Sequence, residues 1–136
     1  MKQTVIFNQL SAKYIEKKDS APADVKQVVY YSLATGHHLG IIDCLQARLQ
    51  CPAEAYRDWI ATLQAGTPAW HKMDGVMRFG EIIIDQSHVS LLAQAFDAAL
   101  PYQSEEQQRW SRALLNLLQA IQEEPVIYLI VRRQYD

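Results

Sequence analysis

The chain has 136 residues, 49% of them apolar and 21% charged, with a formal net charge of −2, which is typical of one soluble globular domain spanning residues 1–136. Its basic residues are dispersed, so nucleic acid is not expected as a partner. The longest apolar runs, 82–84 and 126–131, are far shorter than the ~20 residues that span a bilayer, which argues against direct membrane insertion.

The N-terminal residues lack a long apolar segment followed by a small-residue cleavage site, so we expect a cytoplasmic protein. Residues 4–8 predict a first strand, and the charged segment 13–24, which has no apolar periodicity, predicts a flexible loop. Residues 27–34 predict a second strand because valine and tyrosine dominate there. A helical stripe over 25–34 is the alternative interpretation of the same residues.

Two helices are expected in the middle of the chain. Residues 39–50 predict the first, although the glycine at position 40 weakens its start. The second runs from Pro52 to about Gln64, because proline suits the first helical position and Gly66 suits a left-handed cap. Its apolar residues recur at helical spacing: Ala55, Tyr56, Trp59, Ile60 and Leu63.

The segment 67–79 has weak periodicity and contains Trp70, Met73, Arg78 and Phe79. These residue types are enriched in the cores of protein interfaces. The segment is interpreted either as a loop that recognises a partner or as a loop packed over the core.

The last third of the chain gives the clearest patterns. Residues 88–100 predict a helix capped by Ser87 and stopped by Pro101, and residues 105–123 predict another that opens with a Ser104–Gln107 capping box. Strands are expected at 81–85 and 126–133, and the second is an apolar run typical of a strand covered on both faces. Strands and helices do not alternate strictly. The fold class is therefore α+β: a short mixed or antiparallel sheet of about three to four strands packed with about four helices.

The two cysteines, Cys44 and Cys51, lie seven residues apart. On one helix this spacing is ~10 Å along the axis, too long for a disulfide or for shared zinc ligation. Buried free cysteines that act as small apolar side chains are the favoured interpretation.

The pair His37–His38 lies between Gly36 and Gly40, and Asp43 follows. Adjacent side chains project in different directions, so both imidazoles cannot easily hold one metal ion. Three interpretations stay open: a polar turn between core elements, a surface that faces a partner, or a metal ligand.

Asp85 precedes His88 by three residues at an expected strand-to-helix junction. Such a pair suits acid–base chemistry or metal binding, but capping of the helix by Asp85 or Ser87 is the favoured interpretation.

Arg132 and Arg133 are expected at the rim of the sheet, either bound to a partner's carboxylates or solvated. No nucleophile elbow, phosphate-binding loop or H-E-x-x-H motif occurs, so no catalytic residue, cofactor or metal is expected.

Several long strings of the sequence carry a family resemblance: residues 28–45, 59–63, 80–96 and 127–133. Through them the chain, from about Val5 to Arg133, resembles the formate hydrogenlyase maturation proteins of the HycH type. These are accessory proteins of the hydrogenase-3 and hydrogenase-4 systems, encoded beside the membrane-bound nickel–iron hydrogenases of enteric bacteria. Which of the two systems applies is left open.

The resemblance implies a non-catalytic assembly chaperone whose partner is the immature catalytic large subunit, with the iron–sulfur small subunit as a second candidate. Residues that could contact the partner are His37, His38, Asp43, Trp70, Met73, Arg132 and Arg133. The alternative is a metal-dependent maturation enzyme, similar to a precursor-processing protease, that uses Asp85 and His88 with His37 or His38. A small structural subunit of the finished complex is a third hypothesis.

Overall fold

The computed structural model describes residues 2–10 and 46–135. The expected loop 13–24, the expected strand 27–34, the His37–His38 pair, Asp43 and Cys44 lie outside this part of the chain. The elements, in chain order, are β1 (Gln3–Leu10), β2 (Gln46–Pro52), α4 (Ala53–Ile60), α5 (Pro68–Phe79), β3 (Glu81–Ile84), α6 (Gln86–Ala99), the 3-10 helix η1 (Leu100–Tyr102), α7 (Glu105–Glu123) and β4 (Tyr128–Tyr135).

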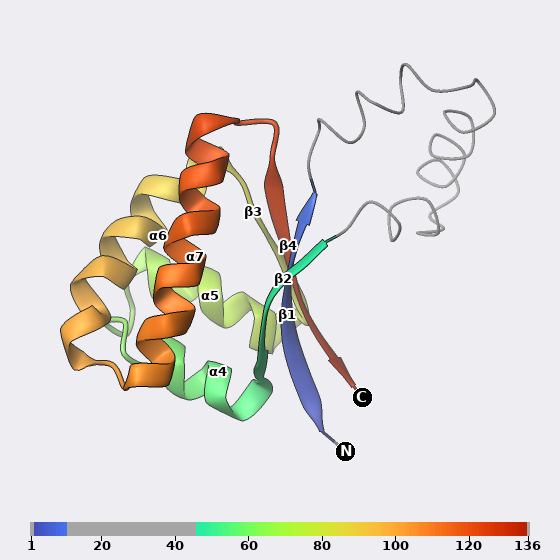
Figure 1. The fold of residues 1–136 in the computed structure, drawn as a ribbon. Helices are drawn as coiled ribbons and strands as arrows, with labels where there is room; N and C mark the ends of the chain where they lie inside the picture. Colours follow the sequence, from blue (N-terminus) through green and yellow to red (C-terminus); the bar gives the residue numbers. More distant parts are fainter. Residues whose placement is uncertain (1, 11–45, 136) are drawn as a thin grey trace.

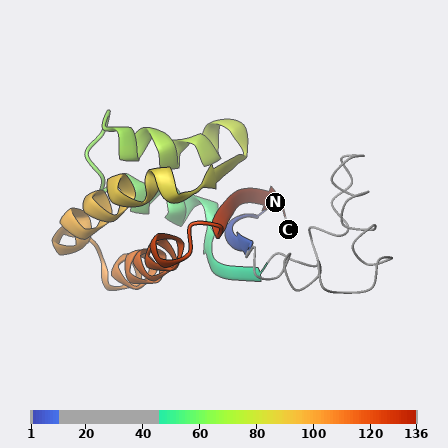
Figure 2. The same ribbon diagram turned by 90° about the horizontal axis from the view of Figure 1, so that it is seen from above.

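The four strands form one antiparallel sheet in the order β2-β1-β4-β3. The central strands β1 and β4 are eight residues each, and Phe7 of β1 lies opposite both Leu49 of β2 and Val131 of β4. All four α-helices lie on the same side of the sheet (Figures 1 and 2). For the described residues, the predicted α+β class is therefore confirmed: a four-stranded antiparallel sheet with four α-helices packed on it.

The core lies between the sheet and the helices, and Trp59 of α4 is at its centre. This side chain is fully buried. Its ring centroid is 5.1 Å from that of Phe96, 5.7 Å from Trp110, 5.9 Å from Tyr56 and 6.0 Å from Phe7. These partners come from β1, α4, α6 and α7, so one side chain joins the sheet to the three helices that pack around it.

The expected helix over 39–50 is wrong for the residues that the structure describes. Residues 46–50 belong to strand β2, which continues to Pro52. The reason is a two-residue period at its end, where buried Leu49 and Cys51 alternate with exposed Gln50 and Pro52. Pro52 consequently precedes helix α4 as its N-cap, and α4 ends at Ile60, earlier than predicted.

The segment 67–79 does pack over the core, which was one of its two interpretations, but its predicted loop conformation is wrong. Pro68–Phe79 is helix α5, with Thr67 as its N-cap: the Thr67 hydroxyl accepts a hydrogen bond from the Trp70 N–H at 3.3 Å. Three buried residues, Ala69, Met73 and Val76, follow one another at helical spacing and face the core. Gly80 ends the helix at φ +87°, a conformation that favours glycine.

Helix α7 spans the predicted residues 105–123, and α6 agrees with the prediction except at its ends. The capping box of α7 is confirmed, since the Ser104 N–H donates to Gln107 Oε1 at 3.0 Å and the Gln107 N–H donates to Ser104 Oγ at 3.1 Å. Helix α6 begins at Gln86 rather than at residue 88, and Pro101 lies within η1.

Strand β4 begins two residues later than predicted, and the pattern of burial corrects the expectation of two covered faces. Leu129 and Val131 are buried on the helical side, whereas Tyr128 and Ile130, on the opposite face, are only half-buried. No helix in the described ranges has the length and apolar character needed to cross a membrane.

Candidate interaction surface

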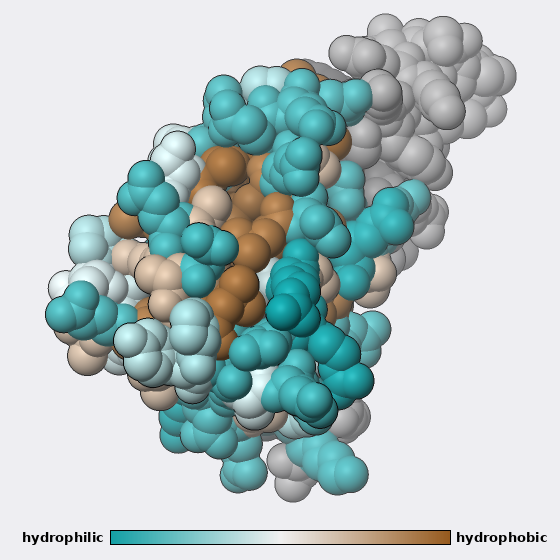
Figure 3. All heavy atoms as spheres, turned by 60° about the vertical axis from the view of Figure 1, so that its left-hand side comes forward, coloured by the Kyte–Doolittle hydropathy of each residue, from teal (hydrophilic) through white to brown (hydrophobic). Residues whose placement is uncertain are grey.

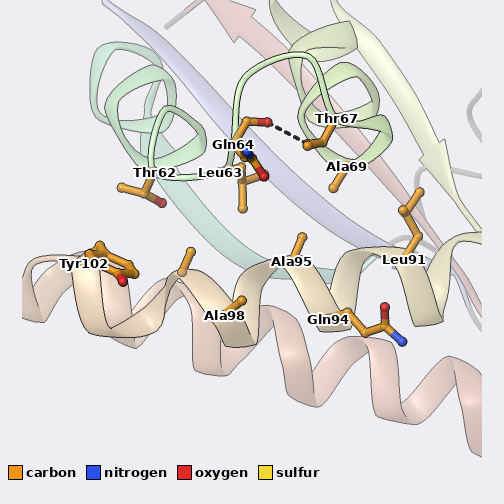
Figure 4. A pocket seen from close by; sticks show the side chains of 11 residues that line it. Thr62, Leu63, Gln64, Thr67, Ala69, Leu91, Gln94, Ala95, Ala98 and Tyr102 are labelled. Carbon is orange, nitrogen blue, oxygen red and sulfur yellow. Dashed lines mark hydrogen bonds between the residues drawn. The ribbon is translucent and has the colours of Figure 1, made fainter.

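An open groove lies between α6 and the connection from α4 to α5 (Figure 4). Its volume is about 430 Å³. Its apolar lining comes from both sides, and includes Leu63, Ala69, Leu91, Ala95, Ala98 and Tyr102. The groove exists because α6 presents alanines at this face, where longer side chains would fill the space between the two elements.

A ring of four hydrogen bonds holds the connection that forms one wall of the groove. The Trp59 indole N–H donates to Ser111 Oγ at 2.9 Å, and that hydroxyl donates to Gln103 Oε1 at 2.6 Å. The Gln103 amide donates to Thr62 Oγ1 at 2.9 Å, and the Thr62 hydroxyl donates to the Trp59 carbonyl at 2.7 Å. Trp59, Gln103 and Ser111 are buried, so this ring fixes the connection to α4 and α7.

The lining of the groove is uncharged. The groups with shifted pKa values lie elsewhere: burial raises the pKa of the Cys51 thiol to about 12, with Glu106 adding to the shift, and burial also raises the pKa of Tyr56. Sites for small molecules usually combine an apolar lining with such perturbed groups. The groove is therefore better suited to apolar side chains of another polypeptide than to a reacting substrate.

The helical face carries further apolar surface. Figure 3 shows apolar side chains gathered in an elongated strip between polar margins on this face. Apolar residues of α6 and α7 that are only partly buried include Ala93, Ala113, Leu117 and Ala120. The strip in Figure 3 is one apolar area rather than a set of scattered single side chains.

Two of the predicted contact residues lie on α5. Met73 is fully buried, where its backbone carbonyl accepts a hydrogen bond of 2.6 Å from the Tyr56 hydroxyl. Its side chain is thus part of the core and has no exposed surface to offer. Trp70 is half-buried, and its ring stands edge-on to His71 at 5.2 Å.

The two arginines lie within the central strand β4, opposite Ile6 and Val5 of β1, rather than at the rim of the sheet after the strand, and they are not equivalent. Arg132 faces the outer side of the sheet, where its Nε and Nη2 lie 2.8 Å and 2.6 Å from Glu81 Oε1. This carboxylate comes from the neighbouring strand β3, so Arg132 already has an intramolecular partner. Arg133 is half-buried, and its backbone N–H donates to the Gly80 carbonyl at 2.8 Å.

Asp85 and His88 form a capping box at the start of α6. Asp85 Oδ1 accepts hydrogen bonds from the Ser87 N–H at 2.9 Å and from the Ser87 hydroxyl at 2.5 Å, while His88 Nδ1 accepts from the Asp85 N–H at 3.1 Å. The Ser87 hydroxyl holds the pKa of Asp85 below its usual value. Asp85 is the N-cap, so the interpretation of this pair as a helix cap is confirmed for Asp85 and is wrong for Ser87. In the described ranges, no three metal-binding side chains gather closely enough to hold an ion.

The capping role of His88 predicts a pH dependence of stability. Burial, with Lys72 adding to it, holds the pKa of His88 below its ordinary 6.5, although Asp85 Oδ1, 3.2 Å from Nδ1, acts in the opposite direction. Since the folded pKa is depressed, this contribution to stability is complete above pH 6.5 and is lost as the pH falls below it. Between pH 7.5 and pH 5.5, we expect the free energy of unfolding of wild type to fall more than that of His88→Gln. The glutamine keeps an acceptor at this position. Urea denaturation of both proteins at pH 7.5 and 5.5 checks this, and an unchanged difference between them would contradict it.

The groove is not among the sites predicted from the sequence, although the sequence of α6 contains a signal for it. Leu91, Ala95, Ala98 and Tyr102 recur at intervals of three and four residues, as a second apolar stripe beside the one that faces the core. Leu91 is 36% exposed and Tyr102 is 82% exposed, so no described element covers the two ends of this stripe.

Comparison with known proteins gives consistent matches along the whole chain. Residues 4–133 match the family described as "Formate hydrogenlyase maturation protein HycH". The protein of that name from Escherichia coli K12 is 55% identical over 136 residues, which is 100% of both chains, and the one from E. coli O157:H7 is equally similar. "Hydrogenase-4 component J" of E. coli K12 is 43% identical over 129 residues, 95% of this chain and 93% of its own. No solved structure matches the chain.

Proposed function

Because the chain belongs to the family of formate hydrogenlyase maturation proteins, HycH, we propose that it is a cytoplasmic assembly chaperone of the formate hydrogenlyase nickel–iron hydrogenase. Its client is the immature catalytic large subunit, and the iron–sulfur small subunit is the second candidate. It acts by binding, without catalysing a reaction on the client. The identity of 55% to the formate hydrogenlyase maturation protein, against 43% to the hydrogenase-4 component, favours a client of the formate hydrogenlyase system.

The observation that carries the proposal is the family match over residues 4–133 together with an uncharged, open apolar groove on the helical side. An unfinished large subunit exposes apolar surface that its partner subunit later covers, and such surface is prone to aggregate. A groove lined by Leu91, Ala95 and Ala98 can take apolar side chains from that surface. This supports binding through shape and polarity rather than through a reacting group.

Release follows from the same physics. A chaperone that binds only the exposed face of the immature subunit loses its affinity when folding or processing removes that face, because a binding equilibrium shifts only through differential contacts. Moderate affinity and fast dissociation are therefore expected. The test is to tag the precursor and the processed large subunit separately and to measure co-purification of this protein with each. Recovery with the precursor alone supports the proposal, and equal or absent recovery rejects it.

A variant in the groove tests whether this surface contacts the client. Ala98→Arg places a long charged side chain in the groove at an exposed position, and should weaken binding of the precursor roughly tenfold or more, because an apolar contact is replaced by a desolvated charge. Ser90→Arg is the matched control: it makes the same change of charge at an exposed position of α6 outside the groove. The measurement is the Kd for the precursor, with thermal melts to verify folding. Equal Kd values for the two variants would exclude the groove.

A further inference from the structure

Strand β3 lies at the edge of the sheet, and its hydrogen-bonding pattern can be followed residue by residue. The Arg133 N–H donates to the Gly80 carbonyl at 2.8 Å, so Gly80 and Arg133 are a hydrogen-bonded pair directly ahead of the Glu81–Arg132 pair. In an antiparallel ladder such pairs alternate along the strand. Ile82 and Ile84 therefore direct their N–H and C=O groups toward β4, whereas Glu81 and Ile83 direct theirs away from the sheet.

Those outward groups meet no other strand in the part of the chain that the structure describes, where β3 ends the strand order and no backbone partner of Glu81 or Ile83 is found. The opposite edge of the sheet differs. Strand β2 has an irregular register opposite Phe7 and Asn8, and it carries an exposed arginine, Arg48, and a proline, Pro52. Bulges, charges and prolines are the usual devices that keep an edge strand from pairing. Strand β3 has none of these at its three isoleucines.

The charge on β3 is also turned away from the open edge. Glu81 is bound by Arg132 across the ladder to β4, so the only ionisable side chain of the strand is neutralised within the sheet. The side chains beside the edge are apolar. Ile83 is 48% exposed on the outer face, and Phe79 is 80% exposed.

Phe79 lies beside β3 on the helical side. A Cβ atom placed on Gly75 would be 2.8 Å from Ile82 Cγ2 and 3.7 Å from Phe79 Cδ2, so both side chains approach the same point of α5. The open edge therefore has an exposed apolar side chain on each of its two faces, and between them lie backbone groups that no described residue pairs with. This arrangement is the one that β-strand addition uses: the backbone supplies hydrogen bonds and the flanking side chains supply apolar contacts.

We propose that the β3 edge binds an extended, apolar and uncharged segment of the client polypeptide, which adds to the sheet by pairing with Glu81 and Ile83. This inference rests on the proposed function, because it takes the client of an assembly chaperone as the source of that segment. A second copy of this chain is the less suitable occupant. A stable dimer buries about 800 Å² on each partner, whereas four strand residues with two exposed apolar side chains provide on the order of half that area. Such an edge suits a transient contact.

Amide exchange in the free protein tests the premise. By NMR, the N–H groups of Glu81 and Ile83 should exchange with solvent much faster than those of Ile82 and Ile84, which bond to β4. Addition of the large-subunit precursor should slow the exchange of Glu81 and Ile83 to the level of their neighbours. Unchanged exchange of these two amides in the complex overturns the proposal. Protection that appears without the precursor and grows with protein concentration also overturns it, because a second copy then occupies the edge.

Ile83→Pro tests the consequence for binding. The Ile83 N–H points outward, so proline removes no ladder bond to β4 while it deletes the outward donor and blocks the edge with its ring. We expect affinity for the precursor to fall roughly tenfold or more, with the thermal melt close to that of wild type. Ile83→Thr is the control, because it keeps the backbone N–H and the branched shape and should lose less affinity than the proline variant.

The outcomes separate the two proposals. Weaker binding of Ile83→Pro than of Ile83→Thr, with both variants folded, supports strand addition. If the two variants and wild type have equal affinities for the precursor, the strand-addition proposal is rejected. The proposed chaperone function is not affected by that result. Failure of wild type itself to bind the precursor rejects the chaperone function, and the inference about β3 with it. If Ile83→Pro does not fold, the amide exchange of the wild-type complex decides.

Discussion

Replacing Trp59 with alanine is expected to lower the free energy of unfolding by about 3–5 kcal/mol, the range for removing a large buried aromatic side chain. Trp59 is fully buried and contacts four other aromatic rings. Its indole N–H also donates to Ser111 in the hydrogen-bonded ring behind the groove. The substitution thus creates a cavity between the sheet and the helices and removes a donor from a buried polar network.

Urea denaturation followed by far-ultraviolet circular dichroism measures this loss. Trp70→Ala is the matched control, because it makes the same chemical change at a half-buried ring on α5. We expect Trp70→Ala to cost clearly less than Trp59→Ala. Comparable losses for the two variants would mean that Trp59 is not the centre of the core. A smaller dependence of the unfolding free energy on urea concentration would instead indicate a loss of two-state unfolding.

The second large effect is expected at Gly75, where α5 packs against β3. A Cβ atom at this position would lie 2.8 Å from Ile82 Cγ2, closer than such atoms approach in folded proteins. The methyl of Ile82 sits on a stiff β-branched side chain within a strand, so it cannot simply rotate away. Gly75→Leu should cost at least the upper end of the ~1–3 kcal/mol typical of overpacking, and its urea midpoint should fall accordingly.

A double-mutant cycle isolates the cause of that effect. Gly75→Ala alone should destabilise, even though alanine favours a helix over glycine by about 1 kcal/mol. In an Ile82→Ala background, which removes the clashing methyl, Gly75→Ala should become neutral or stabilising. Unfolding free energies of the four proteins give the coupling between the two sites. Additive effects in the cycle would show that the close approach of α5 to β3 is not what requires glycine.

Local signals in the sequence were sufficient where an element's own residues determine its limits. Helix α7 and its Ser104–Gln107 capping box were predicted correctly, because the cap is a contact between residues three apart. The core stripe of α6 and the burial of Cys51 were also predicted. In each case the deciding pattern lies within a few residues of the feature that it specifies.

The predictions from the sequence were wrong where a neighbouring element determines the secondary structure or the burial of a residue. Residues 46–50 form a strand because β1 pairs with them, and Met73 is buried because α5 lies over the core. Both sequences contain alternating or helical apolar patterns, but these are short enough to suit more than one structure. Arg132 was expected either to bind a partner's carboxylates or to be solvated, and the strand order gives it Glu81 as an intramolecular partner. A one-dimensional pattern does not specify which carboxylate lies across a ladder.

By itself, the sequence determined the α+β class, the family and the positions of the longest helices, because periodicity, caps and extended similarity are properties of consecutive residues. Only the tertiary structure decided which surfaces stay open. Within the described residues, the groove beside Ala98 and the β3 edge at Ile83 exist because of which elements pack next to them and which do not. Exposure is a property of the assembled layers, where a residue's neighbours in space come from distant parts of the chain.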